Sequence, residues 1–502
     1  MMITYQKGDI LAIYNKIMGI ATKYSRKKKW KKGVDYLSLA AKWAYQFNYF
    51  YTDDEAESLI KFISENVVKP IELPSTLKGK YVLIDSFCFD NRGLTQQYLR
   101  AMIHNEFDIL YICTANKIDR GGDIIRELTD YPHAQILLFT DDTPDAVRIA
   151  NSIVEAVVSY SPAHIFLHIA PWDVAALIAC AAIKGPTIYN INLTDHAYWM
   201  GASLIDYNME FRPYGMTVSI EKRGLKKDQL LGLPFYPVEP IGHPFRGLPP
   251  VTKGSVKILT GGAVYKMLGK DDIFFRMMEL LLSIAPNVYI FVAGFSSDKI
   301  FEEKCSRIVG HERVFLIGVR DDIDAVFQNC DLFLSTYPTS GGLMCQYAAK
   351  YGKPILAYRD KSDMENAVEE MVNHFGTTFR TYTDLNEMIA YAKALITDED
   401  FRNNEGELLK LNMMTPERFF ESFALLMSEG HNNALKWERD AVSYDDFSEH
   451  YLELENTGNN MATRSLLLES NLLLFVRIGG YRMQLLKCWI EIVRDAIVKR
   501  IH

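Results

Sequence analysis

The stretch that decides the fold is residues 331–358, DLFLSTYPTSGGLMCQYAAKYGKPILAY. Residues 332–335 form a short apolar run typical of a strand, and residues 337–342 have the composition of a turn. Residues 343–351 show helical spacing and are followed by a glycine and a proline, which commonly end a helix. Residues 355–357 begin another apolar strand. The stretch therefore predicts a strand, a glycine turn, a helix and a strand, which is a βαβ unit.

The turn of this unit ends in Thr339, Ser340, Gly341 and Gly342. Glycine has no Cβ, so its N–H group can approach a ligand closely. The helix that follows offers unpaired N–H groups and the positive end of its dipole, which favour a phosphate or a diphosphate. A second interpretation is that the two glycines only make a tight turn.

The residues before and after this unit extend the pattern. Residues 314–318 predict a strand that ends at Gly318, residues 322–328 predict a helix, and the unit ends in Gly352-Lys353-Pro354. This order resembles the nucleotide-binding domain of GT-B glycosyltransferases. The resemblance implies an α/β fold in which two Rossmann-like, doubly wound parallel-sheet domains face a cleft. It also implies a nucleotide-diphosphate sugar as donor.

Apolar runs separated by helical segments occur twice along the chain, as parallel sheets require. Six of the eighteen prolines fall within residues 234–250, where they exclude regular structure. The predicted strands are 81–85, 109–113, 136–140, 164–169 and 187–191, then 256–260, 288–293, 314–317, 332–335 and 355–357. We expect an N-terminal helical cap (1–75), an acceptor domain (76–233), a proline-rich linker (234–253), a donor domain (254–430) and a helical tail (431–502).

The composition narrows the class of protein. Of the 502 residues, 48% are hydrophobic and 24% are charged, which is ordinary for a globular chain. The net charge of −8 argues against a nucleic-acid partner. The seven cysteines are scattered without CxxC spacing, as expected of reduced thiols. The N-terminus lacks an apolar signal-peptide core, and residues 174–183 are too short to span a bilayer. We expect a cytoplasmic protein and leave open whether it forms an oligomer.

One basic segment near the N-terminus has two interpretations. Residues 26–32 read RKKKWKK, from Arg26 to Lys32, with Trp30 among the lysines. Such a segment can dock on anionic lipid headgroups, which would place the protein at the inner face of the membrane. The alternative, which we favour, is a solvated helix face.

Three further groups of residues are candidates for donor binding. Gly261 and Gly262 follow the predicted strand at 256–260, and Lys266 comes shortly after them. The resemblance implies that such a glycine turn and its basic residue lie near the donor phosphates, where the lysine would help to neutralise the leaving group. It also implies that Gly318 and Arg320 lie at the nucleobase, and Arg320 could pair with phosphate.

On the acceptor side, the candidate catalytic base is His196, with Asp195 beside it. Both follow the predicted strand at 187–191, and carboxyl ends of parallel strands share one edge of a sheet. Asp195 could orient the imidazole or raise its pKa. The alternative is a structural histidine. The loop Asn91-Arg92-Gly93 is expected at the same edge.

The chain departs from the family in one respect. Many retaining GT-B enzymes carry Glu-x7-Glu across the glycine turn, but Thr339 and Tyr347 occupy those positions here. Gln346 adjoins the second position and could hydrogen-bond a ribose. No Asp-x-Asp or zinc-type cluster is convincing, so we expect no catalytic metal and no cofactor.

The favoured hypothesis is a metal-independent glycosyltransferase of polysaccharide or glycoprotein biosynthesis. It would transfer a hexose or N-acetylhexosamine from a UDP-sugar to a glycan, a lipid-linked sugar or a protein. The alternatives are a UDP-N-acetylglucosamine 2-epimerase, which shares the fold, and a non-catalytic homologue that acts as a binding partner. The missing glutamates motivate the last alternative.

Overall fold

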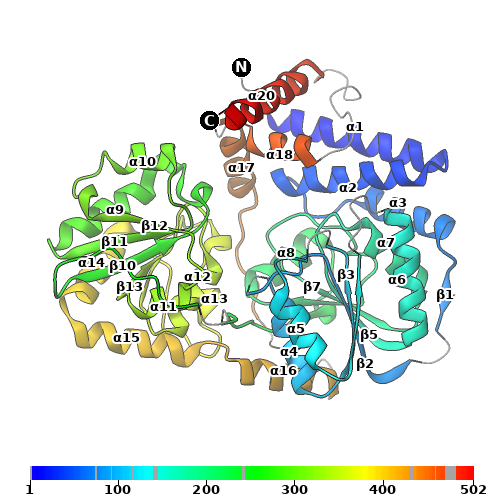
Figure 1. Ribbon diagram of the computed structural model, residues 1–502, viewed down its shortest axis with the longest axis horizontal. Coiled ribbons are helices and arrows are strands. Elements are labelled where there is room, and N and C mark those ends of the chain that lie inside the picture. Colours follow the sequence, from blue (N-terminus) through cyan, green and yellow to red (C-terminus); the bar gives the residue numbers. More distant parts are fainter. Residues whose placement is uncertain are drawn as a thin grey trace. The chain divides into compact units, whose positions relative to one another are not determined.

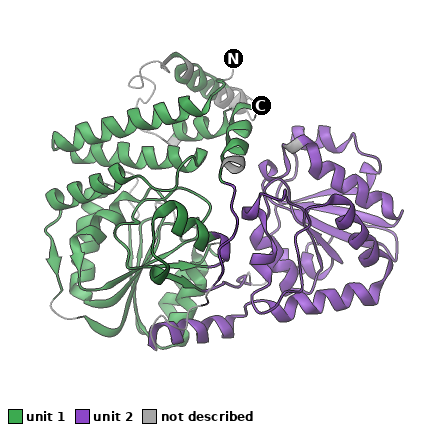
Figure 2. Ribbon diagram, turned by 180° about the vertical axis from the view of Figure 1, so that it is seen from behind, with its two compact units in different colours: residues 1–210, 215–232, 444–502 green, residues 211–214, 233–443 purple. Residues whose placement is uncertain are grey.

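The computed structural model describes residues 3–73, 76–91, 93–115, 118–139, 145–239, 243–428, 435, 437–457, 460–469 and 482–501. The chain divides into two compact units (Figure 2). Unit 1 comprises residues 1–210, 215–232 and 444–502, and unit 2 comprises residues 211–214 and 233–443. Unit 1 thus contains the expected cap, most of the expected acceptor domain and residues 444–502 of the expected tail.

Unit 1 is built on a seven-stranded parallel sheet. Its strands lie in the order β4-β3-β2-β5-β7-β8-β9. Numbered along the chain this is 3-2-1-4-5-6-7, which extends the Rossmann order. The bounds of these strands are β2 Leu77–Asp85, β3 Asp108–Cys113, β4 Ala134–Leu138, β5 Pro162–His168, β7 Thr187–Ile191, β8 Tyr207–Glu210 and β9 Leu230–Gly232.

Helices cover this sheet because their apolar faces bury against it. Val82 and Ile84 of β2 are fully buried, as are Ile153 and Val157 of α6. The helices are α4 Thr95–His104, α5 Gly122–Asp130, α6 Ala146–Tyr160, α7 Val174–Ala182 and α8 Pro213–Arg223, whose first two residues belong to unit 2. A separate pair of short strands joins β1 Ile71–Glu72 to β6 Ile183–Lys184.

The N-terminal helices and the C-terminal helices pack together in unit 1 (Figure 1). Asn460 exchanges hydrogen bonds with the backbone of Ile3, and Asn456 does the same with Tyr5. These side chains tie the two ends of the described chain to each other. The helices are α1 Lys7–Arg26, α2 Trp30–Phe47, α3 Asp54–Val67, α17 Asp445–Thr457, α18 Met461–Glu469 and α20 Arg482–Ile501.

Unit 2 contains a five-stranded parallel sheet in the order β12-β11-β10-β13-β14, which is again 3-2-1-4-5 along the chain. Its strands are β10 Val256–Gly261, β11 Val288–Ala293, β12 Val314–Gly318, β13 Leu332–Leu334 and β14 Ile355–Leu356. Its helices are α9 Ile273–Ile284, α10 Lys299–Cys305, α11 Ile323–Gln328, α12 Gly342–Lys350, α13 Glu369–Val372, α14 Leu385–Thr397, α15 Glu399–Asn412 and α16 Pro416–Ser428. Both units are Rossmann-like, which confirms the predicted fold class.

The sequence analysis missed β8 and β9. Strand β8 carries Asn208 and Glu210, and polar residues do not produce the apolar run by which strands are recognised. Strand β9 is only three residues long and lies just before the proline-rich stretch.

The basic segment from Arg26 to Lys32 spans the end of α1, a turn and the start of α2. Its lysines are exposed, and Lys32 lies over the ring of Tyr24 at 5.7 Å. Among the described residues, no helix is long and apolar enough to cross a membrane. The lipid contact remains a prediction.

Candidate functional site

In each unit the sheet reverses its winding between two strands, and ligands of such sheets bind beyond the carboxyl ends at this switch point. In unit 2 the switch point lies between β10 and β13. β10 ends at Gly261, where a Cβ would come within 2.7 Å of the Ala293 carbonyl oxygen. Gly262 follows with φ of 156°. Gly261 is thus required for packing of the chain, and Gly262 begins the loop that faces the ligand edge.

The other side of this switch point is the start of α12. This helix begins at Gly342, and its N-cap residue Gly341 provides no side-chain cap. Gly341 is buried, and a Cβ there would meet its neighbours at 3.6–3.7 Å, which is ordinary van der Waals contact. Uncapped N–H groups at the start of a nine-residue helix can hold an anion.

Ser340 and Thr339 have other roles than the sequence suggested. The Ser340 N–H donates to Asn366 Oδ1 at 2.6 Å. The Thr339 N–H donates to the Lys266 carbonyl oxygen at 3.4 Å, and its own carbonyl oxygen accepts from Thr336 Oγ1 at 2.6 Å. Both backbone N–H groups are therefore bound within the protein. Of the residues 339–342 that are expected at the phosphate, Gly341 and Gly342 remain as candidates for binding it through backbone N–H groups.

Lys266 lies beside this helix start. Its Nζ donates to the Ser340 carbonyl oxygen at 3.2 Å. Burial lowers the pKa of Lys266, while the Cys345 thiol and the Glu365 carboxyl oppose that shift. The structure thus brings Gly341 to the same edge of the sheet as Gly262 and Lys266, which lie far from it in sequence.

A pocket of about 480 Å³ lies at the ends of β11 and β12. Gly318 lines it with φ of 74°, and a Cβ there would come within 2.9 Å of Ser296 Oγ. This is where the sequence analysis expected the nucleobase. Arg320 also lines the pocket, but its guanidinium forms two hydrogen bonds of 2.6 Å with Asp322 and one of 2.9 Å with the Gly247 carbonyl oxygen. Arg320 therefore holds the 245–249 segment, and its contact with phosphate remains a prediction.

Gln346 is also structural. Its side chain is buried, and Nε2 donates to the carbonyl oxygens of Phe235 and Met371 at 3.2 Å each. Tyr347, at the second missing-glutamate position, donates to the Val238 carbonyl oxygen. The two side chains fasten the segment after β9 to α12, which corrects the expectation of a ribose contact.

In unit 1 the switch point lies between β2 and β5, and it is filled by a buried acid–histidine pair. His168 Nδ1 lies 3.0 Å from Asp85 Oδ1, and both side chains are fully buried. The Leu94 N–H donates to His168 Nε2 at 3.4 Å, which places the ring proton on Nδ1. Thr95 Oγ1 and the Tyr111 hydroxyl donate to Asp85 at 3.0 and 2.7 Å. Sequence reasoning missed this pair because its members are separated by 83 positions.

The pair supports the loop that follows β2. Burial opposes ionisation of Asp85, but hydrogen bonding and charge from His168, with further hydrogen bonds, hold its pKa below the usual range. A Cβ on Gly93 would come within 3.2 Å of His168 Cε1, and Gly93 has φ of 72°. The Asn91 N–H donates to Gln96 Oε1 at 2.6 Å. These contacts with His168 and Gln96 hold the loop in place. Arg92 lies outside the described residues.

His196 and Asp195 lie in the turn after β7, at the same sheet edge. His196 is 28% exposed, and its Nδ1 lies 3.4 Å from Asp195 Oδ1, whose side chain is 1% exposed. The turn is held by Arg223, which donates to the Asp195 carbonyl oxygen at 2.9 Å, and by Asn48, which donates to that of His196. A partly exposed imidazole with a buried carboxylate on one nitrogen has the geometry of a general base.

A second buried acid near this turn was not anticipated. Glu210 accepts hydrogen bonds from Asn192 at 2.9 Å, Asn208 at 2.6 Å and Ser219 at 2.5 Å. Burial raises the pKa of Glu210 to about 7, against the opposing effects of Ser219, Arg223 and Asn192. Perturbed carboxyls concentrate at functional sites. The network joins the ends of β7 and β8 to α8, and so it supports the turn that contains Asp195.

The comparisons agree with this arrangement. No protein-family model matches the chain, and no curated protein matches it in sequence. A glycosyltransferase from Rickettsia africae matches in structure with a TM-score of 0.51 and 11% identity, over 71% of this chain and 98% of that one. The chain has the GT-B fold.

Two further solved structures match less well. An O-GlcNAc transferase variant from Thermobaculum terrenum matches with a TM-score of 0.49 and 15% identity, over 86% of this chain and 81% of that one. A UDP-N-acetylglucosamine 2-epimerase from Listeria monocytogenes, described as putative, matches with a TM-score of 0.49 and 13% identity, over 73% and 100%.

Proposed function

We propose that this GT-B chain is a glycosyltransferase that uses a nucleotide-diphosphate sugar, with UDP as the expected nucleotide. The observation that carries the proposal is the switch point of unit 2, between β10 and β13. There an uncapped helix start at Gly341 lies beside the half-buried Lys266. Helix N-termini and lysine ammonium groups both favour a diphosphate. The glycosyltransferase from Rickettsia africae supports the same class of reaction through its fold.

In the proposed reaction the acceptor hydroxyl attacks C1 of the donor sugar. The bond between C1 and the diphosphate oxygen breaks, and the nucleoside diphosphate leaves with the electron pair. His196 accepts the hydroxyl proton, and Asp195 holds the ring. Lys266 and the start of α12 stabilise the charge that develops on the leaving diphosphate. We propose that these groups do so without a catalytic metal.

We propose a hexosyl or N-acetylhexosaminyl group as the transferred sugar, and a glycan, a lipid-linked sugar or a protein as the acceptor. Thr339 and Tyr347 in place of the two glutamates leave the donor sugar without the carboxylates that many retaining members of the fold use. Tyr347 is bonded to Val238, so that position does not offer a replacement ligand.

A panel of nucleotide sugars tests the proposal. The full chain is incubated with each UDP- and GDP-sugar, with and without a mixed acceptor pool, and the products are separated by chromatography. Release of nucleoside diphosphate with sugar found on an acceptor is the expected result. Conversion of the sugar with the nucleotide intact would replace transfer by epimerisation. Binding of the nucleotide without any turnover would show a non-catalytic homologue.

A further inference from the structure

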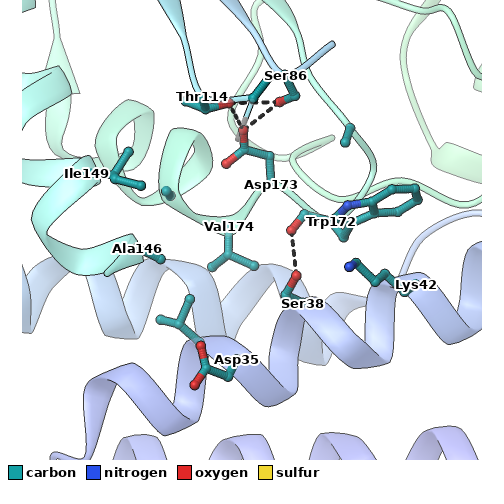
Figure 3. Close-up of a pocket in the computed structure, with 14 residues that line it drawn as sticks. Asp35, Ser38, Lys42, Ser86, Thr114, Ala146, Ile149, Trp172, Asp173 and Val174 are labelled. Atoms are coloured by element: carbon teal, nitrogen blue, oxygen red, sulfur yellow. Dashed lines mark hydrogen bonds between the residues drawn. The ribbon is translucent and has the colours of Figure 1, made fainter. Parts of the chain in front are cut away.

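Unit 1 contains a pocket that none of the residues discussed above occupies. It lies between α2 of the N-terminal helices and the loops that follow β2, β3 and β5, and its volume is about 290 Å³ (Figure 3). Ser86 follows β2 directly and Thr114 follows β3 directly, while Trp172 and Asp173 precede α7. One wall of the pocket is thus formed by loops at the carboxyl ends of the parallel strands, where ligands of such sheets bind. The opposite wall is formed by α2, which belongs to the N-terminal helices.

The sheet wall is rich in hydrogen-bond acceptors. Asp173 Oδ2 accepts from Ser86 Oγ and from Thr114 Oγ1, each at 2.5 Å, and Oδ1 accepts from the Ala176 N–H at 3.1 Å. The two hydroxyl oxygens also lie 3.1 Å from each other, and Thr114 Oγ1 lies 3.4 Å from the Asp85 carbonyl oxygen. Each hydroxyl has one proton and two lone pairs, so each oxygen keeps at least one lone pair for a ligand that donates hydrogen bonds.

The helix wall adds a carboxylate and supports an aromatic ring. Asp35, Ser38 and Lys42 lie along α2 on the side that faces this pocket (Figure 3). Ser38 Oγ donates to the Trp172 carbonyl oxygen at 3.0 Å, and Lys42 Nζ lies 5.5 Å from the centre of the Trp172 ring. Burial raises the pKa of Asp35, and the neighbouring Asp145 adds to that shift while Lys31 opposes it.

The balance of charge decides which ligands suit this pocket. Of the described residues, Asp35 and Asp173 line it with one cation, Lys42, and Asp145 lies close enough to influence Asp35. Like charges across an interface are costly, so phosphates and carboxylates are disfavoured. A neutral ligand must therefore offer hydroxyl donors to the carboxylate and hydroxyl wall and an apolar surface to the indole. A sugar ring has hydroxyl donors at its rim and an apolar C–H face.

We propose that this pocket binds one saccharide unit of a neutral glycan. Its identification as part of the acceptor rests on the proposed function, whereas its preference for a saccharide rests on the pocket alone. The proposal also gives the N-terminal helices a role, because α2 supplies Asp35 and supports Trp172. The helical cap then selects the glycan, and the sheet edge of unit 1 presents it.

The test uses the full chain and the methyl glycosides of glucose, galactose and N-acetylglucosamine, with lysine amide as a cationic probe. Binding is measured by saturation-transfer NMR and calorimetry. We expect at least one glycoside to bind. Asp35→Asn should weaken that binding about tenfold, as expected for loss of a hydrogen bond to a charged group. Asp130→Asn, at the exposed end of α5, is the matched control and should leave it unchanged.

A second variant removes no hydrogen bond. Ala146 lines the pocket, so Ala146→Leu fills part of it, and circular dichroism verifies folding. Loss of glycoside binding in both variants, with the control intact, supports the proposal. Absence of glycoside binding, binding that neither variant alters, or Asp35-dependent binding of lysine amide instead would each overturn it. UDP affinity is measured alongside: its absence in a chain that binds glycosides counts against the transferase and leaves the saccharide site standing.

Discussion

The two switch points of this molecule share a topology and differ in content. In unit 2 the position between β10 and β13 has glycines and an uncapped helix start beside Lys266. In unit 1 the position between β2 and β5 is filled by Asp85 and His168, both fully buried. Strand order locates a ligand edge in each unit. The side chains at that edge decide whether it can receive a ligand, so the two units are expected to respond differently to equivalent substitutions.

The largest effect is expected at His196, because the filled switch point of unit 1 leaves that residue as its candidate base. His196→Ala should lower turnover by about 10²–10⁴-fold, the usual contribution of a general base. UDP affinity should stay near normal, because the donor residues belong to unit 2. Steady-state release of UDP and calorimetry measure the two quantities, and His104→Ala, at the exposed last residue of α4, is the control. Near-normal turnover in a folded His196→Ala protein would show that the histidine is structural.

Substitutions at the switch point of unit 1 should change the free energy of unfolding. Asp85→Ala leaves His168 without its buried partner and should lower the free energy of unfolding by about 3–5 kcal/mol in urea denaturation. Asp108 and His133 form a control pair with a similar N–O distance, 3.1 Å, but 46% and 57% exposed. Asp108→Ala should cost about 0–1 kcal/mol. Equal losses for the two variants would contradict the assignment.

The pH dependence of this pair has a defined sign. The folded pKa of Asp85 lies below its ordinary value, so the folded chain binds fewer protons than the unfolded one. The stabilisation is complete above the unfolded pKa and is lost as pH falls through the folded pKa. Asp85→Asn should therefore flatten the acid side of the stability profile.

Substitutions at the switch point of unit 2 should change the affinity for UDP. Lys266→Ala should weaken UDP binding and slow transfer together, by roughly 10–100-fold, because the lysine would contact the diphosphate before and during its departure. Affinity in the unsubstituted chain should also fall as pH rises through the lowered pKa of Lys266. Calorimetry over a pH series measures this, with the exposed Lys410→Ala as control. A turnover defect without any loss of UDP affinity would move the lysine away from the diphosphate.

A smaller effect is expected from Gly341→Val. The added side chain should obstruct the helix start and weaken UDP binding about tenfold, equivalent to one lost hydrogen bond to a charged group. Folding should be preserved, since the new Cβ would meet its neighbours at no less than 3.6 Å. Gly341→Ala should give an intermediate affinity. Unchanged affinity in a folded Gly341→Val protein would show that the glycines only form a turn.

The smallest effect is expected from chelation. In the proposed mechanism Lys266 and the start of α12 supply the positive charge at the diphosphate, so EDTA should leave the rate of transfer unchanged. The rate is measured before and after dialysis against EDTA. Loss of activity that magnesium or manganese restores would contradict this assignment of the charge.

Some parts of the site could be predicted from the sequence because they depend on the backbone. Gly341 and Gly342 are recognisable where they stand, since a missing Cβ has the same consequence in any environment. Lys266 follows a strand and a glycine turn at short range, and the structure places it beside them. His196 and Asp195 are neighbours in sequence, and their contact required no knowledge of the fold.

Other assignments depended on contacts that the sequence alone does not specify. Arg320 has suitable chemistry for a nucleotide but binds Asp322, which is 2 positions away, and Gln346 binds the carbonyl oxygen of Phe235, which is 111 positions away. Asp85 and His168 lie on two strands that become neighbours only when β5 returns beside β2. None of these contacts leaves a mark on the local pattern.

The sequence by itself determined the alternation of strands and helices, because apolar periodicity and glycine conformation are local properties of the chain. It therefore determined the fold class and the location of the glycine turn before α12. The tertiary structure decided which polar side chains remain available to a ligand. A buried hydrogen-bonding group must find a partner, and that partner is set by the packing around it. That is why Ser340 and Arg320 are bound within the protein, while the start of α12 at Gly341 has no side-chain cap.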